Sequence, residues 1–184
     1  PYCISKVAGM EQIRAINEQL KLPYISVLLP NLYGSGDHYG DDSNHVIPAL
    51  IEKFVKSKLE KLDTVEIWGS GLAVREFLNT KDAAEGLHFL MMNYDSSCPI
   101  NLSSKTNVSI KELAIRIADI ISYQGDLIFD KSKPEGAPRK VSDSSKLSDL
   151  GWESKIGLEV GLEDVIKDYL DRYCKDVSFQ ELIA

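Results

Sequence analysis

The segment CISKVAGMEQIRAINEQLKLPYISVLLP, residues 3–30, decides the expected fold class, because it places a helix directly before a short apolar strand. Within residues 3–20, apolar side chains recur close to the 3.6-residue period of a helix. The run YISVLL at 24–29 is apolar and rich in β-branched residues, and Pro30 is expected to end it. A helix that leads into a buried strand is typical of chains that build a parallel sheet.

The rest of the chain continues this alternation. We expect a turn-rich loop over 31–44, in which Ser43 or Asn44 caps the next helix, and a capping box formed by Ser109 and Glu112. Strands are expected at 65–69, 75–80, 99–104 and 126–130, helices at 45–60, 81–93, 110–123, 143–150 and 158–174, and a loop at 133–140. The sequence therefore predicts an α/β protein with parallel strand pairing.

Composition excludes several classes of function. The 184 residues carry 21 Lys and Arg against 28 Asp and Glu, a net charge of −7, so nucleic-acid binding by charge alone is disfavoured. No apolar run is long enough to span a membrane, and no secretory pattern opens the chain. Cys3, Cys98 and Cys174 are scattered and form neither a disulfide framework nor a metal-ligand cluster. We therefore expect a cytoplasmic setting and no metal.

Two short patterns resemble motifs of nucleotide-cofactor enzymes, and we interpret them differently. Tyr2 and Lys6 are four residues apart, so a helix puts them on one face, where an ammonium favours the phenolate and suits the pair to proton transfer. This spacing is weakly specific by itself. The cluster GSGDHYG at 34–40 follows a strand, but its glycine spacing is one residue too long for a dinucleotide-binding fingerprint, and we interpret it as a loop.

A series of motifs gives the Tyr-x-x-x-Lys pattern a context. In order along the chain they are PNLYG at 30–34, SNHVIPAL at 43–50, WGSG at 68–71, REFL at 75–78, KPEGAPRK at 133–140 and LGW at 150–152. This order resembles the C-terminal half of the extended short-chain dehydrogenase/NAD-dependent epimerase family, and SNHVIPAL and KPEGAPRK resemble its GDP-L-fucose synthase branch. The likeness runs from residue 1 to about 173.

The resemblance implies a domain organisation and a longer parent protein. In that family a portion with the glycine-rich loop precedes the catalytic tyrosine, so we expect this chain to be a C-terminal fragment that is inactive alone. A natural short chain that lost cofactor binding is the alternative. Residues 1–32 and 75–104 are expected to be the remnant of the NADP-binding Rossmann-like domain, 33–74 and 105–173 the substrate-binding domain, and 174–184 a tail.

The resemblance also implies roles at the reacting centre. Tyr2 matches the proton donor to the substrate oxygen, Lys6 the lysine that orients the cofactor ribose, and His45 the acid of the epimerisation steps. The expected cofactor is NADP(H), with contacts from Lys6, His45 and the run Leu29, Pro30, Asn31 and Leu32.

Substrate contacts are implied for five more residues. Arg75 matches an arginine near the substrate diphosphate, and Trp68 matches a tryptophan of the nucleotide-sugar pocket. Lys53 stands where arginine is common, which keeps the charge but loses the bidentate fork. Glu135 stands where aspartate is common, and Lys140 ends the same loop.

Three hypotheses about function remain open at this point. The first is a portion of an epimerase-reductase that converts GDP-4-keto-6-deoxy-D-mannose to GDP-L-fucose, with a GDP-sugar as its small-molecule partner and a homodimer as the full-length enzyme. The second is a fragment of another NAD-dependent nucleotide-sugar epimerase or dehydratase. The third is a non-catalytic module that binds a nucleotide sugar. If preceding strands are missing, an apolar surface should be exposed where they would pack.

Overall fold

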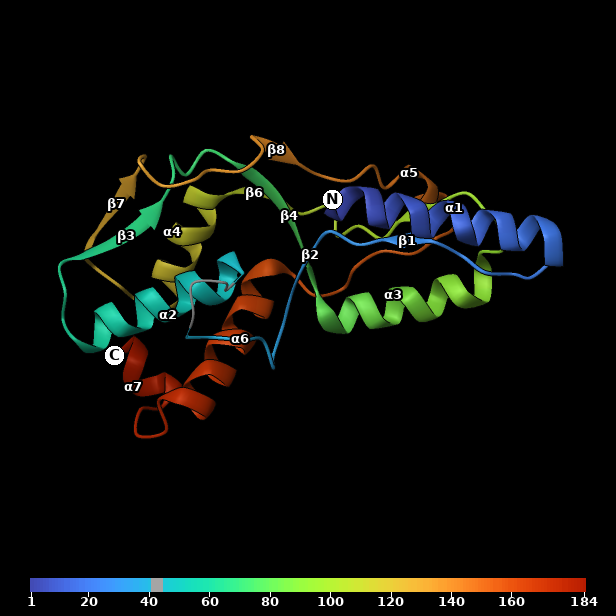
Figure 1. Ribbon diagram of the computed structural model, residues 1–184. Helices are drawn as coiled ribbons and strands as arrows, with labels where there is room; N and C mark the ends of the chain where they lie inside the picture. Colours follow the sequence, from blue (N-terminus) through green and yellow to red (C-terminus); the bar gives the residue numbers. More distant parts are fainter. Residues whose placement is uncertain (41–44) are drawn as a thin grey trace.

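A computed structural model describes residues 1–40 and 45–184 and shows an α/β chain (Figure 1). The helices are α1 (Tyr2–Leu20), α2 (Val46–Leu59), α3 (Thr80–Asn93), α4 (Ile110–Ile120), α5 (Ser145–Asp149), α6 (Leu158–Tyr173) and α7 (Phe179–Ile183). The strands are β1 (Val27–Leu28), β2 (Asn31–Tyr33), β3 (Thr64–Trp68), β4 (Val74–Asn79), β5 (Ile100–Asn101), β6 (Asn107–Ser109), β7 (Asp126–Asp130) and β8 (Arg139–Lys140). The predicted fold class is confirmed.

The strands form three small sheets. β1 pairs with β5, and β3 pairs with β7, both in parallel. β4 pairs in parallel with β2 and β8 and antiparallel with β6. In Figure 1, β4 lies between the part of the molecule that holds α2, α4 and α6 and the part that holds α1 and α3. Strand β4 therefore connects the two ends of the molecule.

The larger hydrophobic core lies among α2, α4 and α6, behind the β3–β7 pair. Its fully buried side chains include Ile51, Phe54, Leu113, Ile117, Leu162 and Ile166. Each such side chain contributes about 1.5–3 kcal/mol relative to leaving it exposed. The predicted capping box is present at the start of α4, where Ser109 Oγ accepts from Glu112 N and Glu112 Oε2 accepts from Ser109 N.

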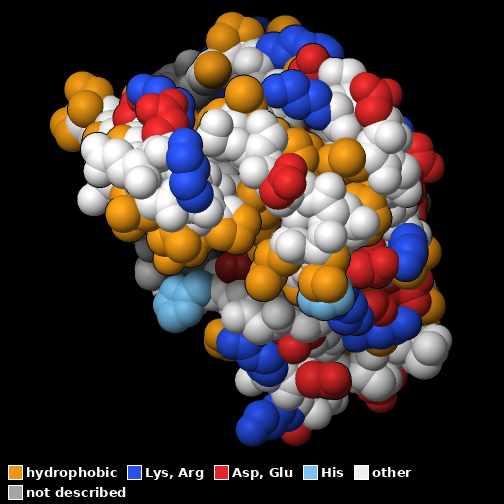
Figure 2. All heavy atoms as spheres, turned by 90° about the vertical axis from the view of Figure 1, so that its right-hand side faces the viewer, with side chains coloured by type: hydrophobic (Ala, Val, Ile, Leu, Met, Phe, Trp, Pro, Cys, Tyr) orange, Lys and Arg blue, Asp and Glu red, His pale blue; other side chains and the backbone are white. Residues whose placement is uncertain are grey.

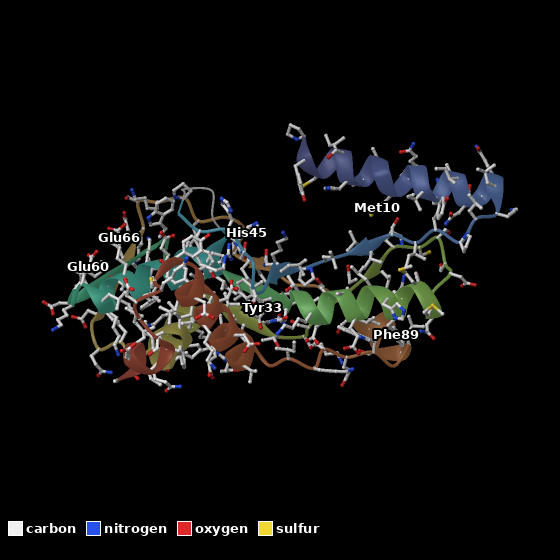
Figure 3. The ribbon with its side chains drawn as sticks, turned by 90° about the horizontal axis from the view of Figure 1, so that it is seen from below. Met10, Tyr33, His45, Glu60, Glu66 and Phe89 are labelled. Atoms are coloured by element: carbon white, nitrogen blue, oxygen red, sulfur yellow. The ribbon has the colours of Figure 1, made fainter. Side chains whose placement is uncertain are left out.

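A smaller core packs α3 against β1, β5 and the segment around α5. Leu78, Leu90, Ile100, Leu102 and Trp152 are buried in it. In Figures 1 and 3, α1 and α3 lie on opposite sides of β1, which gives this end a layered helix–strand–helix arrangement. No residue of α1 is buried, so the helix is held by partial contacts only.

Exposed apolar side chains gather at this end of the molecule. Ile4 and Val7 on α1 are 74% and 52% exposed, and Met91 and Met92 on α3 are 73% and 72% exposed. The view in Figure 2 faces this end and shows hydrophobic side chains in several groups between charged ones. Among the described residues, no helix is both long and apolar enough to cross a bilayer.

Some boundaries differ from the expectation because short strands depend on their neighbours. β2 lies inside the predicted loop 31–44, where the chain after Pro30 pairs with β4. β8 lies in the predicted loop 133–140, and α7 lies in the tail, with Leu182 in the larger core. β1 and β5 are shorter than predicted. Ser43 and Asn44 lie outside the described residues, and the N-cap of α2 is His45.

Candidate active site

A pocket of about 700 Å³ opens between α2, the end of β3, the start of β4 and the loop 131–138. Five of the predicted site residues line it: Asn31, Lys53, Trp68, Arg75 and Glu135. They come from β2, α2, β3, β4 and the loop after β7. The pocket size and its mixture of apolar and charged walls suit a small organic ligand with charged groups.

Trp68 forms an exposed wall of this pocket. It is the last residue of β3, where burial alternates along the strand, and its side chain is 48% exposed. Two ammonium groups lie over the ring, with Lys53 Nζ 5.3 Å and Lys133 Nζ 5.4 Å from the ring centroid. Lys53 Nζ also donates a 2.9 Å hydrogen bond to the carbonyl of Glu66. Each exposed cation–π contact contributes about 0.5–1 kcal/mol.

A glycine-rich turn next to Trp68 holds Glu135. Gly69 has φ +84° and Gly71 has φ +76°, a backbone conformation that L side chains rarely adopt. The turn presents Ser70, whose Oγ donates a hydrogen bond to Glu135 Oε1 and accepts a 3.1 Å hydrogen bond from the Leu72 amide. Ser70 was not predicted as a site residue, although its place between two glycines of WGSG is a usable signal.

Arg75 lies across the pocket from this turn. Its Nη1 donates a 2.8 Å hydrogen bond to the Val74 carbonyl, and a Cβ on Gly136 would lie 3.1 Å from its Nη2. A glycine at 136 therefore lets the guanidinium approach the loop closely. Lys140 is the register partner of Arg75 in the β4–β8 pair, but it is exposed and does not line the pocket.

The buried carboxylate of Glu76 anchors the strand that carries Arg75. Glu76 is 1% exposed and accepts hydrogen bonds from Ser103 Oγ, from the Ser104 amide at 2.8 Å and from the Ser142 amide at 2.9 Å. Its carbonyl accepts a 2.9 Å hydrogen bond from Asn31 Nδ2. Sequence reasoning missed Glu76 as an organising residue, because its three donors come from segments beyond residue 100.

Tyr2 and Lys6 lie together at the first turn of α1. Lys6 Nζ is 5.3 Å from the centroid of the Tyr2 ring, so the pair shares a helix face as the spacing predicts. Tyr2 is 73% exposed, and neither residue lines the pocket. Tyr33, by contrast, is buried in the larger core, and burial raises its pKa to about 12.

His45 sits at the start of α2, next to Val46, which lines the pocket. Its side chain is 78% exposed, and its Nδ1 lies 3.8 Å from a carboxylate oxygen of Asp37. Figure 3 shows His45 at the surface, on the side of the molecule where α1 lies. The structure thus places His45 at the rim of the pocket and not inside it.

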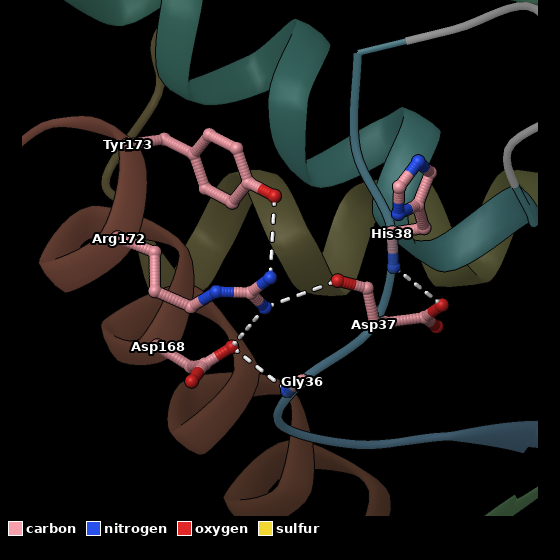
Figure 4. Close-up of polar contacts among 6 residues, drawn as sticks. All are labelled: Gly36, Asp37, His38, Asp168, Arg172 and Tyr173. Carbon is pink, nitrogen blue, oxygen red and sulfur yellow. Dashed lines mark hydrogen bonds and ion pairs between the residues drawn. The ribbon is translucent and has the colours of Figure 1, made fainter.

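Hydrogen bonds hold the loop that carries Asp37 against α6 (Figure 4). Arg172 Nη1 donates to the Asp37 carbonyl at 3.0 Å and to Asp168 Oδ2 at 3.1 Å, and Asp168 Oδ2 accepts from the Gly36 amide at 3.0 Å. The glycine cluster at 34–40 is therefore a loop held by a helix, as interpreted from its spacing.

The run Leu29–Leu32 lies at the carboxyl end of β1, where ligands of open α/β sheets bind. Leu28 and Leu29 are 41% and 42% exposed, which leaves apolar surface for a flat ring to contact. Pro30 and Leu32 are half-buried. In the part of the chain that the structure describes, no group of three or more His, Cys, Asp or Glu side chains could hold a metal ion.

Comparison with known proteins identifies the family. The family described as "NAD dependent epimerase/dehydratase family" matches residues 1–102, more than half of the chain. The chain belongs to this family. The matched region contains Tyr2, Lys6, His45, Lys53, Trp68 and Arg75 and ends in the segment that supplies the smaller core.

Individual relatives extend the likeness over most of the chain. The chain is 41% identical over 170 residues to "Putative GDP-L-fucose synthase 2" of Arabidopsis thaliana, covering 92% of this chain and 52% of the relative. It is 40% identical over 161 residues to "GDP-L-fucose synthase" of Sinorhizobium fredii, covering 88% and 51%. The chain thus spans about half the length of the curated relatives it matches.

A solved structure gives the same result. A GDP-L-fucose synthetase from Naegleria fowleri, crystallised bound to NADP, is 30% identical with a TM-score of 0.78. The match covers 89% of this chain and 51% of that chain. The chain therefore shares the fold of about half of that longer protein.

Proposed function

We propose that the chain is the C-terminal portion of an NADP(H)-dependent epimerase-reductase that converts GDP-4-keto-6-deoxy-D-mannose to GDP-L-fucose. The observation that carries the proposal is the pocket in which Lys53, Trp68, Arg75 and Glu135 meet. The identities of about 40% to GDP-L-fucose synthases support the substrate class. On this proposal the chain supplies the substrate pocket and the proton-transfer residues.

The reaction needs two kinds of proton transfer, and the proposal assigns one residue to each. Tyr2 donates a proton to the substrate oxygen and polarises the ketone, with the Lys6 ammonium beside it. His45 acts as the acid that returns a proton to the carbons that are epimerised, a role that suits an imidazole. NADPH, when bound, supplies the hydride that reduces the ketone.

We assign the cofactor side of the site to the residues at the end of β1. The half-exposed Leu29, with Pro30, Asn31 and Leu32, offers an apolar wall for the nicotinamide ring, and the carboxyl end of a parallel strand pair is the usual place for it. Lys6 and His45 are proposed to contact the cofactor as well. The domain organisation is also part of this proposal. Residues 1–32 and 75–104 would belong to the NADP-binding domain, and residues 33–74 and 105–173 to the substrate-binding domain.

On the substrate side, Arg75 and Lys53 are proposed to bind the diphosphate, Trp68 to contact the nucleotide sugar and Glu135 to accept hydrogen bonds from the base or ribose. Lys140 stands outside the pocket wall and is proposed only as a long-range positive charge. The exposed face of α1 is proposed as the packing surface of a homodimer in the whole enzyme, since Ile4 and Val7 are uncovered.

Calorimetric titration of the 184-residue chain tests this proposal. We expect GDP to bind at least tenfold more tightly than UDP, because Glu135 can accept from guanine N–H groups. The chain alone should not consume NADPH in the presence of the 4-keto sugar. Equal affinity for GDP and UDP would favour another nucleotide-sugar epimerase or dehydratase, and absence of GDP binding would contradict the proposal.

In the whole enzyme, Tyr2→Phe should abolish reduction, whereas His45→Gln should abolish epimerisation of the substrate ring carbons. If both variants keep these activities, neither residue belongs to the reacting centre.

A further inference from the structure

Three cationic side chains lie close to Trp68. Lys53 and Arg75 line the pocket, and Lys133 lies over the ring of Trp68, which is part of the pocket wall. None of the three forms an ion pair within residues 1–40 and 45–184. Lys56, which also lines the pocket, is paired with Glu60 at 3.9 Å. Although the net charge of the protein is −7 and the carboxylates of Glu52 and Glu135 line the same pocket, the three cations at this opening attract an anion.

The position of Lys133 is set by a tight turn after β7. Asp130 accepts hydrogen bonds from the Ser132 amide at 2.9 Å and the Ser132 hydroxyl at 2.7 Å, and its carbonyl accepts from the Lys133 amide at 3.3 Å. The same carbonyl accepts a 2.9 Å bond from the Gly69 amide, directly after Trp68. The turn therefore brings the backbone of residue 133 beside the Trp68 strand end.

The side chains of Lys133 and Lys53 both contact the ring of Trp68. Both ammonium groups lie within 5.4 Å of the Trp68 centroid, although like charges repel each other. A doubly charged anion placed between them removes this repulsion and accepts hydrogen bonds from both. Lys53 already uses one donor on the Glu66 carbonyl, and a lysine is a point charge without a bidentate fork, so a second cation is needed for a diphosphate.

We propose that Lys133 is a further substrate-binding residue, which together with Lys53 holds the diphosphate of a nucleoside-diphosphate ligand beside Trp68. The inference rests on the proposed function, because it specifies how the same pocket recognises the phosphates. Arg75 faces the same opening through the Gly136 contact, so the three cations surround the phosphates from α2, β4 and the loop after β7.

Matched variants of the loop give the test. Lys133→Gln removes the cation over Trp68, and Lys131→Gln removes an exposed lysine two residues away in the same loop. GDP and guanosine are titrated calorimetrically into the wild-type chain and both variants at 50 and 300 mM NaCl. We expect Lys133→Gln to weaken GDP binding about fivefold to tenfold relative to Lys131→Gln and to reduce its salt dependence, with guanosine affinity unchanged.

The outcomes separate this inference from the proposed function. Equal GDP affinities of the Lys133→Gln and Lys131→Gln variants, with the wild type binding GDP, overturn the role of Lys133 alone. Equal losses of GDP and guanosine affinity in Lys133→Gln also overturn it, because they indicate a general disturbance of the pocket. A wild-type chain that binds no GDP overturns the proposed function and this inference together.

Discussion

Ser70 donates its hydroxyl hydrogen bond to Oε1 of Glu135, which ties the turn after β3 to the loop after β7. The two residues are 65 positions apart in the sequence, and Glu135 lines the pocket. Because Oε1 is held, the carboxylate is oriented before a ligand arrives, and less conformational entropy is lost on binding. Preorganisation of this kind is what a carboxylate needs to recognise the edge of a base.

Replacing Ser70 tests this orientation. Ser70→Ala should weaken GDP binding by about threefold to tenfold, since the Glu135 carboxylate loses its partner and becomes free to rotate. Ser70→Thr keeps the hydroxyl and should retain most of the affinity. Calorimetric titration of both variants with GDP measures the difference. The same affinity in the alanine and threonine variants would show that the hydrogen bond does not orient Glu135 for binding.

The buried carboxylate of Glu76 leads to a prediction about stability. Glu76→Gln turns an acceptor of three hydrogen bonds into a group with one oxygen and an NH₂ that faces donors. We expect the free energy of unfolding to fall by about 2–4 kcal/mol, because a buried donor is then left unsatisfied. Urea denaturation followed by circular dichroism measures the change. Glu66→Gln, at an exposed position of β3, is the matched control and should change stability little.

Local signals in the sequence were sufficient for much of the fold. The alternation of DLIFD predicts β7 with its observed bounds, Asp126–Asp130, and the Ser109/Glu112 capping box predicts the start of α4. Strands of two or three residues, such as β2 and β8, have too few residues for a periodic signal. They exist because β4 offers hydrogen-bonding partners on both sides.

The candidate site was predictable where a motif carried it and not where a contact between distant segments created it. Trp68, Arg75 and Glu135 are named by the resemblance and meet in the pocket. Ser70 and Lys133 act through groups that are brought near only by folding. No sequence pattern could indicate that the turn at Asp130 sets Lys133 over Trp68, because the β3–β7 register decides it.

The capping box of α4 predicts a pH-dependent stability. The hydrogen bonds from Ser109 lower the pKa of Glu112, so its contribution to stability is present above the unfolded-state pKa and is lost as pH falls through the folded-state value. Ser109→Ala should therefore lower Tm by about 2–4 °C at pH 7 and by less at pH 3.

Calorimetric melts of both proteins at the two pH values check this prediction. The Ser70→Thr variant leaves α4 unchanged, so its melts control for effects of mutation and purification that do not involve the cap. A Tm difference as large at pH 3 as at pH 7 would mean that the Glu112 charge contributes nothing to the cap.

The two tryptophans make the charge around Trp68 measurable. Trp152 is 5% exposed and shielded from solutes, whereas Trp68 is 48% exposed with two ammonium groups over its ring. Relative to its quenching of free N-acetyl-tryptophanamide, iodide should therefore quench the fluorescence more than caesium does at equal ionic strength, because anions concentrate near Lys53 and Lys133. Lys133→Gln should reduce quenching by iodide and leave quenching by neutral acrylamide unchanged, while Lys131→Gln should alter neither. Equal quenching by iodide and caesium in the wild-type chain, each relative to N-acetyl-tryptophanamide, would show that the ring carries no local positive field.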